Sequence, residues 1–187
     1  KGAKICENLH EMPGAKFFPE AKLNYAENLL QSPDDSLAIE EFREDGFSNE
    51  LTRKELKNKT LKMAGWLKSK GIKKGDRVCA YMPNCSETII TMLATSALGA
   101  IFSSCSSDFG VEGVIDRFEQ IEPKIMIAAN GYLYNGKVID RSEEIKKISK
   151  RLPSLEHILV VEYISSNKDI YNFPNFDTVF QSDTLES

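Results

Sequence analysis

The feature of this sequence that most constrains its fold is a regular alternation of helical and strand patterns between Thr52 and Ala129. Two of the helical patterns end at glycines, Gly71 and Gly99, and an apolar strand pattern follows each of them. Strands that are joined in this way by helices usually run in the same direction within one sheet. The sequence therefore predicts the α/β class, with a mostly parallel sheet that has helices on both faces.

Capping signals mark the start of two of these helices. Thr52 and Glu55 form a capping box, because the threonine hydroxyl can accept from a backbone amide while the glutamate reaches back. Asn84 and Glu87 have the same spacing and predict a second capping box, before a helix that is apolar around much of its circumference. Gly71 is expected to end the first helix in a left-handed backbone conformation. The inner stripe of that helix is expected to consist of Leu56, Thr60, Met63, Ala64 and Leu67.

The patterns divide the chain into three parts. Residues 1–22 have little periodicity and are expected to form an irregular lead-in, residues 23–165 one α/β subdomain, and residues 166–187 a polar, loop-like end. The expected helices cover residues 23–30, 52–70, 85–98, 111–120 and 142–151. The expected strands cover residues 37–42, 47–51, 78–82, 101–102, 124–129 and 157–161, with loops at 103–108 and 130–137.

Composition and charge argue against several classes of function. A net charge of −4 does not favour nucleic acid or an anionic membrane as a partner. Four cysteines without a C-x-x-C pair, and only two histidines, argue against zinc, and no metal site is expected. No stretch approaches the roughly 20 apolar residues of a membrane span. Unpaired cysteines and the absence of a visible signal peptide favour a reduced, cytoplasmic compartment.

One segment looks like a phosphate-binding loop. Gly131 to Lys137 fits the first seven positions of a Walker motif and follows a strand. Position eight is Val138, which has no hydroxyl for magnesium, and Tyr132 and Tyr134 are bulky where backbone amides must approach phosphate. A true Walker loop is therefore disfavoured. Two interpretations remain open, a loop that touches a phosphorylated ligand at the carboxyl edge of the sheet, and a plain connector.

A second polar segment, Ser103 to Asp108, follows a strand and precedes a helix. Its small side chains and backbone amides could contact a ligand, although such a turn is more often only a connection. Cys105 is not expected to be a nucleophile, because no histidine lies near it in sequence.

Several segments together resemble the amino-terminal part of the AMP-forming acyl-CoA synthetases, which belong to the adenylate-forming superfamily. They are Leu23–Leu30, Gly71–Val78, Met82–Asn84, Leu98–Ala100 and Ser107–Val111. Ser107–Val111, followed by Asp116–Phe118 and Gln120–Lys124, is most similar to the acetoacetyl-CoA synthetase branch. The resemblance covers residues 16–165 and implies the first subdomain of the adenylate-forming ligase fold.

The resemblance also implies an activity for a longer protein. The full-length enzyme would use ATP with Mg²⁺ to convert a carboxylate to an acyl adenylate, and coenzyme A would then displace AMP. The family's phosphate loop, adenine motif, ribose-binding aspartate and catalytic lysine have no counterpart here, so no catalytic residue is expected in this chain. The chain begins with Lys1 and reads as about the first third of such an enzyme. Its expected partners are the remainder of the same polypeptide and small-molecule substrates.

Two other functions remain open. One is a synthetase for another short acyl chain, because most of the family's acyl pocket would lie beyond Ser187. The other is a freestanding, non-catalytic α/β module that binds a nucleotide-like ligand or a partner.

The resemblance places candidate binding residues in the two polar segments. Related acetyl-CoA synthetases contact coenzyme A through a segment of the form Arg-Gly-Gly-Lys, which matches Tyr134, Asn135, Gly136 and Lys137 here. Gly136 and Lys137 fit the motif, whereas Tyr134 replaces its arginine. Ser106 and Ser107 match a glycine-containing segment near the same ligand, and the neighbouring Asp108 would repel phosphate.

Overall fold

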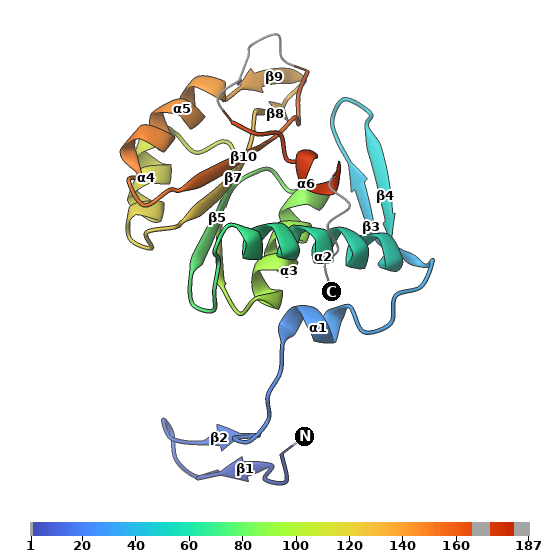
Figure 1. Ribbon diagram of the computed structural model, residues 1–187, viewed down its shortest axis with the longest axis vertical. Coiled ribbons are helices and arrows are strands. Elements are labelled where there is room, and N and C mark those ends of the chain that lie inside the picture. Colours follow the sequence, from blue (N-terminus) through green and yellow to red (C-terminus); the bar gives the residue numbers. More distant parts are fainter. Residues whose placement is uncertain (1, 166–172, 182–187) are drawn as a thin grey trace.

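The centre of the protein is a parallel sheet of four strands. The computed structural model describes residues 2–165 and 173–181 (Figure 1). The sheet has the strand order β10-β7-β5-β6, and each neighbouring pair is parallel. Its strands are Arg77–Tyr81 (β5), Ile101–Cys105 (β6), Ile125–Ala129 (β7) and His157–Val161 (β10). The predicted parallel sheet is confirmed.

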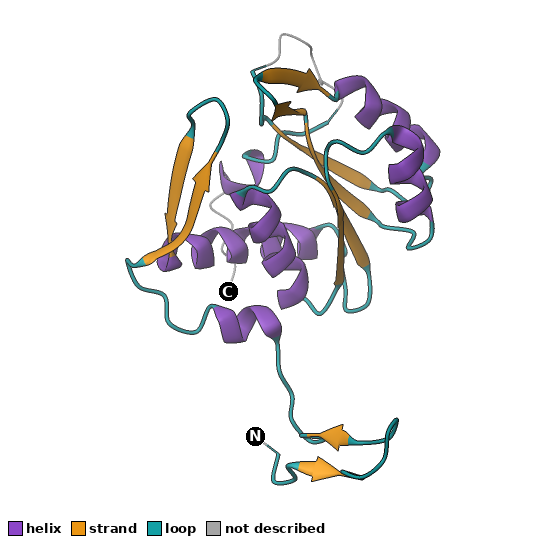
Figure 2. Ribbon diagram, turned by 180° about the vertical axis from the view of Figure 1, so that it is seen from behind, coloured by secondary structure: helices purple, strands orange, loops and turns teal. Residues whose placement is uncertain are grey.

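Helices cover both faces of this sheet, as the alternating pattern predicts (Figure 2). One face packs against Arg53–Ser69 (α2) and Ser86–Ala97 (α3), the other against Val111–Glu119 (α4) and Ser142–Arg151 (α5). Because side chains alternate along a strand, each central strand contributes to two separate cores. Val78, Ala80, Ile125 and Ile127 belong to the α2–α3 core, and Cys79, Tyr81, Met126 and Ala128 belong to the α4–α5 core.

Smaller elements surround this body. Tyr25–Leu29 (α1) contacts α3, and Leu37–Phe42 (β3) pairs with Ser48–Thr52 (β4) in an antiparallel hairpin beside α2. A second hairpin, Gly131–Tyr134 (β8) with Lys137–Asp140 (β9), follows β7. In the described part of the chain, no helix is both long and apolar enough to cross a bilayer.

Most of the predicted helix boundaries are confirmed. Thr52 and Glu55 form both bonds of the capping box, and the five residues of the expected inner stripe are the buried residues of α2. Gly71 and Gly99 follow the helix ends with φ values of 80° and 68°, in the left-handed region. No residue of α3 is fully exposed, which agrees with its apolar circumference.

The predicted capping box of α3 is wrong. The N-cap is Cys85, whose side chain makes no capping bond, and Asn84 is exposed. The backbone amide of Ser86 instead donates to the Glu41 carboxylate of β3 over 3.0 Å. A side chain 45 positions earlier in the sequence thus replaces the local cap, since the first helical amides accept any well-placed acceptor.

The two predicted loops also differ from the structure. Ser103, Ser104 and Cys105 belong to β6, because they pair with Cys79, Ala80 and Tyr81 of the neighbouring strand. Residues 130–137 are not a loop, because Gly131 to Tyr134 form β8 and pair with β9. Asn135 and Gly136 have φ values of 50° and 71°, the succession of left-handed residues that a tight hairpin turn requires.

Both ends of the described chain contain more structure than expected. In the predicted lead-in, Cys6–Glu7 (β1) pairs with Lys16–Phe17 (β2), and Figures 1 and 2 show this pair away from the main body. In the predicted loop-like end, Thr178–Gln181 forms α6. Phe176 and Val179 anchor it, since they are 2% and 4% exposed in the α2–α3 core. Residues 166–172 and 182–187 lie outside the described residues.

Candidate ligand-binding site

The two predicted binding segments both leave the carboxyl edge of the parallel sheet. The Ser106–Gly110 loop follows β6, and the β8–β9 hairpin follows β7. This edge is where loops of parallel α/β sheets usually meet ligands. The structure thus places the candidate residues on one side of the molecule, although β6 and β7 are not adjacent strands.

The β8–β9 hairpin presents two different faces. Tyr132 pairs with Ile139 and Tyr134 with Lys137, so these side chains share one face under the two-residue period of a strand. Leu133 and Val138 pair on the opposite face. Tyr134 is 66% exposed, and Asn135, Gly136 and Lys137 are exposed with it at the tip. The predicted Tyr134–Lys137 segment is therefore accessible to a ligand.

The hairpin tip already contacts one carboxylate. The backbone amide of Gly136 donates to Glu44 over 3.0 Å, and Glu44 lies in the turn between β3 and β4. This bond shows that the Gly136 amide points outward and can bind a negatively charged oxygen.

The loop after β6 is fixed from beneath by a buried tyrosine. The Tyr81 hydroxyl lies 2.9 Å from the carbonyl oxygen of Ser107 and 2.7 Å from that of Phe109, and its one proton is shared between these two acceptors. Burial raises the pKa of Tyr81 to about 12, although the nearby Arg141 opposes this rise. The hydroxyl therefore keeps its proton, and its role as a donor, throughout the physiological range.

Arg141 joins this loop to the hairpin. Its Nε donates to the Ser107 carbonyl over 3.0 Å, and its Nη2 lies 3.4 Å from the Asp108 carbonyl and 3.3 Å from the Tyr132 hydroxyl. The guanidinium carbon is 5.2 Å from the centre of the Tyr132 ring. Nη1 forms a 3.5 Å ion pair with Glu144. One side chain thus contacts both candidate segments and the first turn of α5.

Sequence reasoning missed Tyr132 and Arg141 as functional candidates. No local pattern identified them, because Arg141 follows β9 at the start of α5 and its contacts to the loop are to backbone carbonyls. Ser107 is also placed differently from expectation. It is 1% exposed and its hydroxyl has no partner among the described residues, so its backbone rather than its side chain organises the site. Ser106 is exposed.

None of the three buried cysteines is suited to nucleophilic chemistry. Burial raises the pKa of the Cys105 thiol and of the Cys79 thiol, and it raises that of Cys85 to about 12. These groups remain neutral thiols, and the thiolate is the reactive form. The prediction that Cys105 is not a nucleophile gains a physical basis here.

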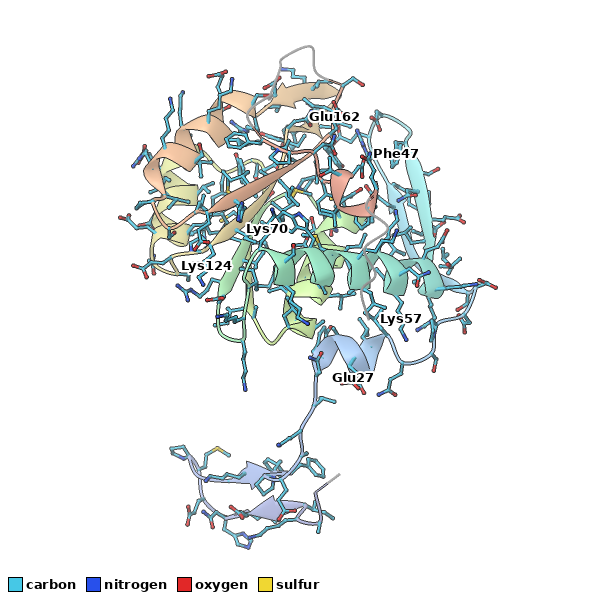
Figure 3. The ribbon with its side chains drawn as sticks, viewed as in Figure 1. Glu27, Phe47, Lys57, Lys70, Lys124 and Glu162 are labelled. Atoms are coloured by element: carbon cyan, nitrogen blue, oxygen red, sulfur yellow. The ribbon has the colours of Figure 1, made fainter. Side chains whose placement is uncertain are left out.

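The opposite face of the hairpin borders a separate groove of about 590 Å³. Its lining includes Phe47 from the β3–β4 turn, Leu133 and Val138 from the hairpin, and Glu162 after β10. Figure 3 shows Phe47 and Glu162 together at this end of the molecule. The Arg43 guanidinium lies 4.0 Å from the centre of the Tyr163 ring and forms a 2.9 Å ion pair with Asp45, so its charge is already partnered.

Comparison with known proteins agrees with this architecture. The family described as "AMP-binding enzyme" matches residues 26–181. The chain is 47% identical over 151 residues to an acetoacetyl-coenzyme A synthetase of Rhizobium meliloti, covering 81% of this chain and 23% of the relative. It is 40% identical over 174 residues to an acetoacetyl-CoA synthetase of Macaca fascicularis, covering 91% and 26%.

A solved structure agrees in three dimensions. Acetoacetyl-CoA synthetase from Streptomyces lividans superposes with a TM-score of 0.86 at 32% identity, over 97% of this chain and 28% of that protein. The chain therefore spans about a quarter of the length of the relatives that it matches. The family match extends across most of the sequence and includes the sheet, both helical layers and the candidate site. The chain belongs to the AMP-binding enzyme family.

Proposed function

We propose that this chain is the amino-terminal part of an acetoacetyl-CoA synthetase, which joins acetoacetate to coenzyme A by way of an acyl adenylate. The observation that carries the proposal is the similarity of nearly the whole chain to proteins of that name, at up to 47% identity and with a TM-score of 0.86. ATP, as its magnesium complex, and coenzyme A would be substrates of the full-length protein. The proposed compartment is the cytoplasm.

The test is the activity of the full-length protein. Incubation with ATP, Mg²⁺, coenzyme A and acetoacetate should produce acetoacetyl-CoA, AMP and pyrophosphate. Acetate, propionate and butyrate in parallel reactions test the alternative of another short-chain synthetase. A clear preference for one of those acids would contradict the acetoacetate assignment, and no thioester from any acid would favour a non-catalytic module.

The role proposed for the described chain is to hold part of coenzyme A. Tyr134, Asn135, Gly136 and Lys137 are exposed at the hairpin tip, and Ser106 and Ser107 begin the loop at the same sheet edge. Lys137 would contact a phosphate, and the outward Gly136 amide would donate to an anionic oxygen, as it does to Glu44. Because these groups are exposed, each contact should contribute about 1 kcal/mol or less and should weaken in high salt.

Lys137→Ala in the full-length enzyme tests this role. The expected result is an increase in KM for coenzyme A of several-fold, about what 1 kcal/mol gives, with little change in adenylation. Lys68→Ala, at an exposed lysine on α2, is the matched control and should leave both unchanged. Unchanged coenzyme A kinetics for Lys137→Ala at low ionic strength would show that this lysine binds no phosphate.

The 187-residue chain alone is expected to lack ligase activity, since it offers no counterpart of the family's phosphate loop or catalytic lysine. Pyrophosphate release with ATP and acetoacetate should stay at the level of the blank. Turnover above the blank would contradict this expectation.

A further inference from the structure

The Arg141 side chain is largely buried, as is that of Arg43 at 12% exposed, and it contacts several separate elements of the fold. The Arg141 side chain is only 16% exposed, although arginine is rarely buried to this extent without partners. Its contacts come from three separate elements, namely the loop after β6, the hairpin after β7 and the start of α5. Two of the contacted groups are backbone carbonyls, which every residue has, so the sequence does not reveal these contacts.

We propose that Arg141 is a positioning residue for coenzyme A binding, because it fixes the Ser106–Gly110 loop against the face of the β8–β9 hairpin that carries Tyr132, Tyr134 and Lys137. The proposal rests on the proposed function and adds to it a residue that does not match the Arg-Gly-Gly-Lys motif. Arg141 acts through the loop and the hairpin rather than by touching the ligand.

The geometry of the guanidinium explains why an arginine performs this role. Its planar fork donates through Nε to Ser107 and through Nη2 toward Asp108 and Tyr132, so that one rigid group satisfies acceptors on two segments. A lysine ammonium at the end of a flexible chain cannot reach these acceptors in one fixed arrangement.

The remaining contacts show that Arg141 is itself fixed in place. Its backbone amide donates to the Asn130 carbonyl over 2.7 Å, which ties it to the end of β7. Tyr81 holds the same Ser107 carbonyl from the sheet, so this oxygen accepts from both sides. The loop is therefore anchored to the sheet by Tyr81, and in the described part of the chain Arg141 links it to the hairpin through Tyr132.

The positive charge of Arg141 is also expected to favour the binding of coenzyme A. Asp108 and Glu144 both interact electrostatically with Tyr81 beneath the loop, and Glu144 forms a 3.5 Å ion pair with Arg141. The cation offsets their repulsion of phosphate without occupying the exposed hairpin tip.

The test uses the full-length enzyme and separates the two half-reactions. Adenylation is measured by exchange of pyrophosphate into ATP with acetoacetate, and thioester formation is measured over a range of coenzyme A concentrations. Arg141→Gln should raise KM for coenzyme A about tenfold, because misplacing a binding segment costs one to two orders of magnitude, while adenylation stays within about twofold. Arg151→Gln is the matched control, since Arg151 lies on α5 but pairs with Glu112 at the surface.

Two further variants keep the test decisive. Arg141→Lys retains the charge but not the fork, so it should keep most, but not all, of the increase in KM for coenzyme A expected of Arg141→Gln. Tyr132→Phe removes only the hydroxyl that meets Arg141 and should raise KM in the same direction by a smaller factor, even where Arg141→Gln fails to fold. Hydrogen exchange of amides 106–110 should accelerate in each variant relative to the wild type and to Arg151→Gln.

The possible failures are distinguishable. A wild-type enzyme that forms no thioester removes the proposed function, and with it the proposal on which it depends. An active wild type with unchanged KM for coenzyme A in Arg141→Gln and Tyr132→Phe overturns the positioning role alone. Full recovery by Arg141→Lys also overturns it, because charge without the fork would then be sufficient.

Discussion

Removal of the Glu41 carboxylate tests how α3 is stabilised at its amino end. Glu41 is 8% exposed on β3, and one of its oxygens accepts from the Ser86 amide over 3.0 Å. No side chain of the local sequence caps this helix. Glu41→Ala therefore removes the cap and leaves a buried amide without its acceptor, because Ser86 is 2% exposed.

The expected magnitude follows from two contributions. Loss of an N-cap acceptor costs about 1 kcal/mol. Loss of a negative charge near the helix amino terminus costs about another 0.3–1 kcal/mol. Glu41→Ala should thus lower the free energy of unfolding by about 1.3–2 kcal/mol, or Tm by about 3–8 °C for a chain of this size. Glu41→Gln keeps an acceptor without the charge, so it should lower the free energy of unfolding by only about 0.3–1 kcal/mol.

Urea unfolding monitored by circular dichroism measures this difference. Glu40→Ala is the control, because Glu40 is the adjacent residue of β3 but is exposed, and its loss should change stability by less than about 0.5 kcal/mol. If Glu41→Ala unfolds at the same urea concentration as Glu40→Ala, with an unchanged slope, the carboxylate does not stabilise α3 and the reasoning is refuted.

Three further predictions concern the rest of the fold. In the native protein, iodoacetamide should modify the partly exposed Cys6, and it should reach the buried Cys79, Cys85 and Cys105 only after denaturation. Rapid labelling of all four cysteines in the native protein would contradict the burial that raises the pKa values of those three thiols. Gly71→Ala should lower the free energy of unfolding by about 1 kcal/mol through backbone strain alone, because φ is 80° and an added Cβ meets no atom within 4 Å. An unchanged Tm would mean that the backbone of this turn relaxes without strain. The pKa of Asp76 is lowered, first by the backbone amide of Lys73 and then by Lys124, so the ionised carboxylate stabilises the fold above about pH 4 and this stabilisation is lost as pH falls through the lower folded pKa. Asp76→Asn should therefore be less stable than wild type near pH 7, and the difference in stability should shrink in acid. A difference in stability that does not change with pH would show that the carboxylate charge is not its cause.

Local sequence signals determine much of the architecture. Each signal depends on residues within one or two helical turns, which interact directly. Examples are the buried stripe of α2, the Thr52 capping box and the glycines after α2 and α3. The same holds for the parallel sheet, because strands separated by helices have few other ways to pair. The Asn135-Gly136 turn was also a local signal, but the likeness to a Walker motif obscured it.

Other features arise only when distant segments meet. The α3 cap depends on Glu41 from a separate hairpin, and the length of β6 depends on hydrogen bonds to β5, which no local propensity specifies. At the candidate site, the sequence alone was sufficient to predict two polar segments at one edge of the sheet, which include Ser106, Ser107 and Lys137. Arg141 was not identified because its partners are mainly backbone carbonyls and a hydroxyl on other elements, and every residue has a carbonyl. Hydrogen bonding to the main chain leaves no residue pattern to read, so only the tertiary structure could bring this arginine into the site.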